Sequence, residues 1–213
     1  MLKRFGYWCE WGLFSLELNL INPDICYHLF EPIPTTFDMM KKTAKLNEIN
    51  TVKFKMNNEG MSNEKGSFDF YLPGSSEAAS LQPIDDQFYL KESDEMGNYS
   101  GNSTIKKVEC KVNTIDNYVK ENNVEDIGFI KIDVEGNEKS VLLGAENTLK
   151  KFQPLVYCEL LRIHASRFGY HPNEVIEYMK KFNYKCHTMR NEKLIQIDEI
   201  DEETQETNFV FKV

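Results

Sequence analysis

Residues 127–160 read IGFIKIDVEGNEKSVLLGAENTLKKFQPLVYCEL. The first seven residues are mostly apolar, which indicates a buried strand, and Gly136 interrupts the pattern soon afterwards. Asn137 is suited to cap the helix that follows. The apolar face of that helix consists of Val141, Leu142, Ala145 and Leu149. Pro154 then opens a second apolar run, so the stretch predicts a strand, a helix and a strand, which is the βαβ unit of a parallel sheet.

Strand and helix patterns alternate on both sides of this unit. Further strands are predicted at residues 25–30, 51–56, 67–72, 106–112, 184–189 and 207–213, and further helices at 34–47, 115–121 and 171–182. This alternation is typical of an α/β fold with a mostly parallel sheet covered on both faces. The last strand alternates apolar and polar residues, which suits an antiparallel edge.

Two polar stretches are predicted to lie outside the core. Residues 73–103 are rich in Gly, Ser, Asn and acidic residues and are expected to form a surface loop. This loop is either a lid over a site or a solvated insertion without a role. The acidic stretch at 198–206 is expected to be a solvated turn before the last strand.

The composition favours one globular domain over residues 1–213. The chain is 41% hydrophobic and 28% charged, with a net charge of −9, which disfavours nucleic acid and anionic lipid as partners. Its five cysteines include no CxxC pair, so we expect buried, reduced thiols. No apolar run reaches the roughly 18 residues of a membrane span, and the first residues do not resemble a signal peptide. We therefore expect a cytoplasmic protein without membrane insertion, and the sequence leaves the oligomeric state open.

Acidic residues follow three of the predicted strands. They are Glu31, the pair Asp133 and Glu135, and Glu159. Ligands of open parallel sheets bind at the carboxyl ends of the strands, so these side chains are candidate site residues. Glu31 can accept hydrogen bonds from two ribose hydroxyls, or it can cap the helix that follows. The other three could instead gather a divalent cation, although no residue here is assigned to a metal.

Four segments carry a resemblance to a known family. They are FEPIP at 30–34, TIDNYV at 114–119, FIKIDVEGNEKSVLLGA at 129–145 and PLVYCEL at 154–160. In order and spacing they are similar to motifs of the FkbM family of O-methyltransferases. The resemblance extends from about residue 13 to residue 213.

This resemblance implies a Rossmann-like class I methyltransferase sheet, mostly parallel, with an antiparallel C-terminal edge strand. It also implies S-adenosylmethionine as methyl donor and a hydroxyl of a sugar, lipid or secondary metabolite as acceptor, hence a small-molecule or glycan partner. By the same similarity Glu31 would hold the cofactor ribose, and the turn that contains Ser62 would lie against the adenine. Asp133 and Glu135 would face the methyl-transfer cleft as the catalytic residues.

The same residues include candidates for the base that takes the proton from the hydroxyl to be methylated. Asp133 and Glu135 are the preferred candidates, with Glu159 and His164 as alternatives. His164 is more simply interpreted as an exposed loop histidine. Lys131 is expected to balance the charge of Asp133.

The sequence departs from the family pattern in its cofactor loop, which resembles D-x-G-x-x-x-G in related enzymes. The matching residues 6–12 read GYWCEWG, and only Gly12 fits as a cofactor-binding glycine. Trp8 stands where the ligand needs bare backbone. Either the start at Met1 is shortened, or the chain is a weak or inactive methyltransferase-fold binding module. A nicotinamide dehydrogenase is disfavoured because no G-x-G-x-x-G follows a strand.

Overall fold

The computed structural model describes residues 13–22, 24–49, 52–72, 79–83 and 105–213. The predicted loop at 6–12, with Gly12 and Trp8, lies outside the described residues, as does most of the predicted surface loop at 73–103. Within the described residues no helix combines the length and apolarity needed to cross a bilayer.

The first part of the described chain is a helix followed by a β-α-β unit. Helix α1 (Leu13–Ile21) precedes β1 (Tyr27–Phe30), α2 (Pro34–Leu46) and β2 (Phe54–Asn57), and β1 and β2 pair in parallel. The rings of Tyr27 and Phe54 stack 4.6 Å apart between the two strands. The predicted strand at 25–30 and the helix that follows it are confirmed, because a buried apolar run and Pro34 at the helix start set both.

A second, three-stranded sheet follows. It contains β3 (Gly60–Met61), β4 (Gly66–Leu72) and β5 (Lys106–Asn113) in the order β3-β5-β4, with β4 and β5 antiparallel. Ser80 extends this sheet by a backbone bridge to Tyr71. Helix α4 (Ile115–Glu121) begins at Thr114, whose hydroxyl accepts a hydrogen bond from the backbone N–H of Asn117 at 3.0 Å, as its predicted N-cap role requires.

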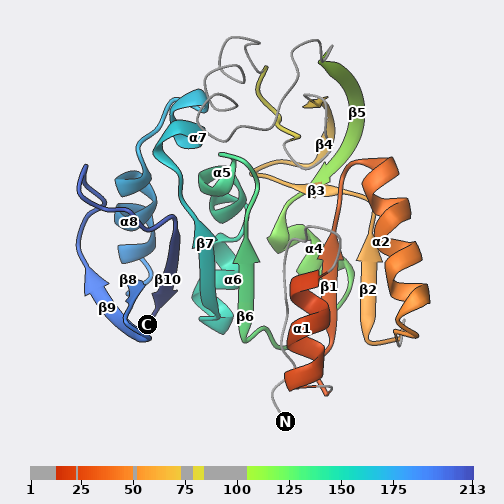
Figure 1. Cartoon of the computed structure of the whole chain (residues 1–213), viewed down its shortest axis with the longest axis horizontal. Coiled ribbons are helices and arrows are strands. Elements are labelled where there is room, and N and C mark those ends of the chain that lie inside the picture. The colour runs from red at the N-terminus through yellow and green to blue at the C-terminus, as the bar shows by residue number, and fades with distance from the viewer. Residues whose placement is uncertain (1–12, 23, 50–51, 73–78, 84–104) are drawn as a thin grey trace.

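The third sheet has five strands in the order β6-β7-β10-β8-β9. They are β6 (Phe129–Ile132), β7 (Leu155–Glu159), β8 (Lys185–Arg190), β9 (Lys193–Ile197) and β10 (Asn208–Lys212). Helices α5 (Glu138–Leu143) and α6 (Glu146–Phe152) connect β6 to β7, and α7 (Arg162–Arg167) and α8 (Pro172–Lys180) connect β7 to β8. Figure 1 shows β1 and β2 on one side of β6, and β7 to β10 on the other.

The largest core cluster lies around this five-stranded sheet. Its fully buried members come from β6, β7 and β10 and from the helices between them, as Ile130, Val156, Phe209 and Leu149 illustrate. Phe14 of α1 stacks near Phe129 and Tyr157, so α1 packs against β6 and β7. The apolar runs that predicted these strands therefore supply the core.

Two features of the predicted sheet are corrected. The C-terminal strand β10 is antiparallel, as expected, but it pairs with β7 on one side and β8 on the other, so it is not an edge strand. The sheets are mixed rather than mostly parallel, because β4, β8 and β9 also pair in antiparallel fashion. Strand β9, whose residues are largely exposed, forms the edge. Alternation along a strand reveals its faces but not its neighbours.

The residues after Asn137, which were predicted to form one helix, form two. Helix α5 ends at Leu143, and an added Cβ on the next residue, Gly144, would lie 2.1 Å from the backbone oxygen of Ser62. The chain from β3 therefore passes directly against this glycine, and α6 starts afresh after Ala145. Asn137 makes no side-chain capping bond to α5. This close approach links two segments that are far apart in sequence, so periodicity alone could not indicate the break.

Candidate functional site

The loop between β6 and α5, residues 133–137, is held from inside by Glu138. Its carboxylate accepts hydrogen bonds from the backbone N–H groups of Val134 at 3.2 Å and Gly136 at 2.9 Å, and from the hydroxyl of Tyr170 at 3.0 Å. Glu138 is 3% exposed, and burial raises its pKa. The loop conformation is thus specified by a buried side chain that sequence reasoning did not single out.

Gly136 is required in this loop for two reasons. Its φ is +105°, a conformation that L side chains rarely adopt. A Cβ at this position would also lie 2.6 Å from the backbone oxygen of His164 and 2.8 Å from ring carbons of Phe168. The loop therefore packs without a gap against α7 and the residues after it.

Three of the predicted strand-end carboxylates lie together here. Lys131 Nζ is 2.6 Å from Asp133 Oδ2, so the predicted charge-balancing pair is present. Burial, the nearby charge of Asp133 and a hydrogen bond to that residue together raise the pKa of Glu159 to about 8. Glu159 therefore carries a proton near neutral pH and shares it with Asp133.

Glu135 pairs with His164. Its Oε2 lies 3.2 Å from Nδ1 of His164, whose side chain is 14% exposed on α7, so the expectation of an exposed loop histidine is wrong. Burial lowers the pKa of His164 to about 4, and the positive charge of Arg167 contributes. The imidazole is therefore neutral at physiological pH. Arg167 also donates a hydrogen bond to the backbone oxygen of Glu135 at 3.0 Å.

Glu31 lies at the carboxyl end of β1. Its Oε1 accepts a hydrogen bond at 2.7 Å from the backbone N–H of Ile33, the residue that precedes α2, and none of the described residues donates one to Oε2. Burial raises the pKa of Glu31 to about 8. The helix-capping interpretation thus accounts for one oxygen only. Asn58 holds the turn by donating to the backbone oxygens of Glu31 and Pro32.

Glu31 and the other three carboxylates come from strands that run in the same direction. The arrowheads of β1 and β6 point to the same end of the molecule (Figure 1), which is where Glu31 and the loop at 133–137 follow these strands. Among the described residues no hydrogen bond or ion pair joins Glu31 to Asp133, Glu135 or Glu159.

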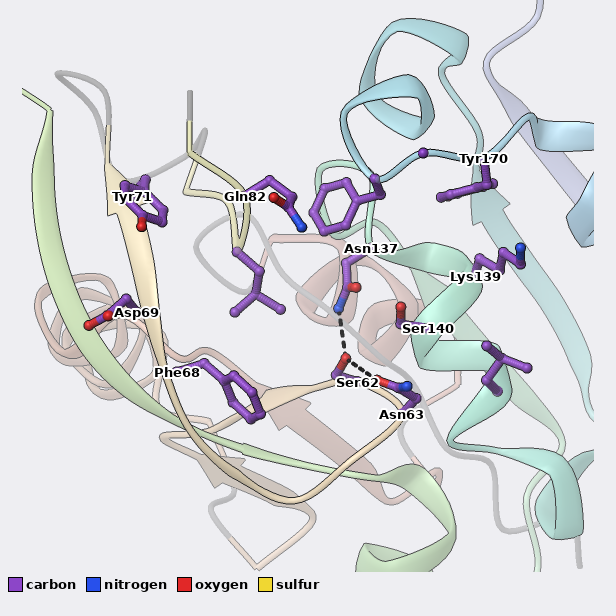
Figure 2. Close-up of a pocket in the computed structure, with 14 residues that line it drawn as sticks. Ser62, Asn63, Phe68, Asp69, Tyr71, Gln82, Asn137, Lys139, Ser140 and Tyr170 are labelled. Atoms are coloured by element: carbon purple, nitrogen blue, oxygen red, sulfur yellow. Dashed lines mark hydrogen bonds between the residues drawn. The ribbon is translucent and has the colours of Figure 1, made fainter. Parts of the chain in front are cut away.

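Ser62, the third predicted cofactor-binding residue, lines a pocket of about 480 Å³ between β4 and α5. Figure 2 shows its hydroxyl accepting a hydrogen bond from Nδ2 of Asn137 and donating one to Oδ1 of Asn63, both at 3.2 Å. Asn137 also donates to the backbone oxygen of Met61 at 3.3 Å. The structure thus brings Ser62 together with Asn137 rather than with Glu31, which does not line this pocket.

The five described residues of the predicted surface loop contribute to the same pocket. Leu81 and Gln82 form part of its lining, and Ser80 anchors them to β4 through the bridge to Tyr71. These residues are therefore not an insertion without contacts.

The described part of the chain contains no group of three or more His, Cys, Asp or Glu side chains arranged to hold a metal ion. The clustered carboxylates have protein partners instead. Lys131 neutralises Asp133, and Glu159 shares a proton with it.

Comparisons with known proteins identify the family. The model of the FkbM methyltransferase domain matches residues 16–186. A comparison with curated proteins finds no match. The FkbM methyltransferase of Methylobacillus flagellatus KT has a similar structure, with a TM-score of 0.59 at 10% identity. This likeness covers 100% of the present chain but 44% of that protein, so the chain spans less than half of its length.

A second structure, the precorrin-6y C5,15-methyltransferase of Geobacter metallireducens GS-15, aligns with a TM-score of 0.45 at 7% identity, over 99% of this chain and 79% of the other. At 10% identity the likeness to the Methylobacillus flagellatus structure concerns the fold alone. The family model, in contrast, matches well over half of the sequence. The chain therefore belongs to the family of FkbM methyltransferase domains.

Proposed function

We propose that the chain transfers a methyl group from S-adenosylmethionine to a hydroxyl oxygen of a small-molecule or glycan acceptor. The observation that carries this proposal is the group of carboxylates at the ends of β6 and β7, beside a polar pocket. A carboxylate at this strand end suits a cationic sulfonium and can receive the proton that the acceptor hydroxyl loses.

Glu31 fits the role of holding the cofactor. It is a buried carboxyl with one oxygen committed to Ile33, and the other receives no hydrogen bond from the described residues. A ribose hydroxyl can supply the missing donor. When bound, S-adenosylmethionine supplies a methyl group on a positively charged sulfur. Gly12 remains a candidate cofactor residue, whereas Ser62 lines the neighbouring polar pocket, which Glu31 does not line.

Glu135 is the proton acceptor that the geometry favours. Asp133 is already engaged by Lys131 and by the proton of Glu159. The neutral imidazole of His164 lies within reach of one oxygen of Glu135 and can orient it. Because most of the rate of such a displacement comes from alignment, the rigid loop around Gly136 contributes by fixing this carboxylate.

The composition bears on the class of methyl acceptor and on the cellular compartment. A net charge of −9 argues against a nucleic acid or an anionic lipid surface as the partner. The four cysteines of the described chain are free and three of them are buried, which is the pattern of a reducing compartment. We therefore propose a cytoplasmic enzyme.

Calorimetric titration with S-adenosylhomocysteine, the product form of the cofactor, tests the proposal. We expect saturable binding by the unaltered chain and at least tenfold weaker binding by Glu31→Gln, with Glu109→Gln on the exposed face of β5 as the matched control. The absence of binding up to millimolar ligand would reject the enzyme and favour a non-catalytic module. In Glu135→Gln we expect unchanged binding but a methyl-transfer rate lower by about 10²–10⁴.

A further inference from the structure

The pocket in Figure 2 has a lining rich in uncharged polar groups. Asn63, Gln82 and Asn137 contribute carboxamides, and Ser62 and Ser140 contribute hydroxyls. Carboxamides both donate and accept hydrogen bonds, which matches the dual character of a ligand hydroxyl. The bond from Ser62 to Oδ1 of Asn63 also fixes the orientation of that amide, so its NH₂ group is left to donate elsewhere.

Aromatic rings stand on opposite sides of this pocket. Phe68 and Tyr71 come from β4, and Tyr170 comes from the segment after α7 (Figure 2). Phe168, from that same segment, also lines the pocket. Ring faces favour flat, apolar C–H surfaces. A pyranose presents such a surface above and below its ring and presents hydroxyls around its rim, so amides and aromatic rings together suit a sugar.

The two charged side chains of the lining already have counter-ions outside it. Asp69 pairs with Lys107 at 2.6 Å, and Lys139 pairs with Glu174 at 2.7 Å. Their charges are therefore offset before a ligand enters. A phosphate, sulfate or carboxylate ligand would find no uncompensated cation among these lining residues, and a neutral ligand would leave both ion pairs intact.

The pocket also shares a wall with the carboxylate cluster. Asn137 lies two residues after Glu135, and the ring of Phe168, which lines the pocket, packs against the intervening Gly136. A volume of about 480 Å³ falls within the range of roughly 300–1,000 Å³ of small-molecule sites. We propose that this pocket binds the methyl acceptor and that the acceptor is a neutral carbohydrate, an inference that rests on the proposed methyl transfer.

Saturation-transfer NMR on the whole chain tests this assignment. The probes are the methyl glycosides of glucose, galactose and mannose, their uronic acid and 6-phosphate counterparts, and hexanol, each with and without S-adenosylhomocysteine. We expect a saturation-transfer signal from at least one neutral glycoside, and a smaller signal from its charged counterparts and from hexanol. Tyr71→Ala and Gln82→Ala should weaken glycoside binding at least tenfold, whereas Tyr71→Phe keeps the ring and should preserve it.

The outcomes separate the two proposals. Binding of S-adenosylhomocysteine without binding of any neutral glycoside leaves the methyltransferase proposal standing and overturns the sugar assignment. A preference for the charged sugars or for hexanol also overturns it, as does glycoside binding that Tyr71→Ala and Gln82→Ala leave unchanged. Glycoside binding that both variants weaken, in a chain that does not bind S-adenosylhomocysteine, supports the pocket and rejects the enzyme. Gln196→Ala on the exposed strand β9 serves as the control variant and should bind as the unaltered chain does.

Discussion

Replacing Gly136 by alanine should destabilise the fold and displace the loop that carries Asp133 and Glu135. Two contributions add. An L residue with positive φ costs about 1–2 kcal/mol. The new Cβ would also lie 2.6 Å from the backbone oxygen of His164 and 2.8 Å from the ring of Phe168, and such overpacking costs about 1–3 kcal/mol. We therefore expect a loss of about 2–5 kcal/mol in the free energy of unfolding.

Gly169 provides a matched control for this prediction. Its φ is also positive, at +72°, but no neighbouring heavy atom lies within 4 Å of an added Cβ. Gly169→Ala should therefore cost only the conformational part, about 1–2 kcal/mol. Urea unfolding followed by far-UV circular dichroism gives both values from the midpoints, provided that the slopes agree.

The comparison of the two alanine variants tests whether the loop at Gly136 packs closely against α7. If Gly136→Ala and Gly169→Ala lose the same stability, the close packing between this loop and α7 is not present in solution. If the argument holds, Gly136→Ala should also lower the methyl-transfer rate more than it weakens S-adenosylhomocysteine binding, because Glu135 moves while Glu31 does not.

Three further outcomes follow from carboxylates that accept backbone hydrogen bonds. Glu31 has a folded pKa near 8, against 4.5 for the ordinary group, so the folded state retains a proton that the unfolded state loses, and stability should fall as the pH rises from 4.5 to 8. Thermal unfolding across this range should give a shallower decline for Glu31→Gln, by up to roughly 1.4 kcal/mol per pH unit, and equal slopes would contradict the assignment. Glu138→Ala strands two backbone N–H groups and the hydroxyl of Tyr170 and should cost about 3–5 kcal/mol by urea unfolding, while Glu138→Gln should stay within about 1–2 kcal/mol of the unaltered chain. Asp116 accepts hydrogen bonds from the first-turn N–H groups of α6, so Asp116→Ala should lower the free energy of unfolding, measured with urea, by about 1–2 kcal/mol, and no change would show that these bonds are unimportant.

The sheet illustrates how far local patterns reach. Strands β1, β5, β7, β8 and β10 were predictable because each is a short apolar or alternating run. The position of β10 between β7 and β8 was not, since pairing partners depend on contacts between residues far apart in the chain. Strand β9 was not predicted, because its apolar residues Leu194, Ile195 and Ile197 do not alternate strictly with polar ones and the run is short.

The site shows the same division. That Asp133, Glu135 and Glu159 share one region could be predicted, because they follow neighbouring parallel strands. The roles of Glu138 and Asn137 could not, since a glutamate and an asparagine at a helix start read as ordinary first-turn residues. Their importance comes from Tyr170 and Ser62, which the fold brings from other segments.

The sequence by itself determined the α/β class, most helix and strand positions, the FkbM resemblance and the strand ends at which carboxylates gather. Hydrophobic periodicity and turn residues are local signals, so they can be read from neighbouring residues. Only the tertiary structure decided the protonation of Glu159, the neutrality of His164, the split at Gly144 and the pocket around Ser62. Burial, close approach and charge proximity are properties of residues that meet in space, and they have no counterpart in the local order of the chain.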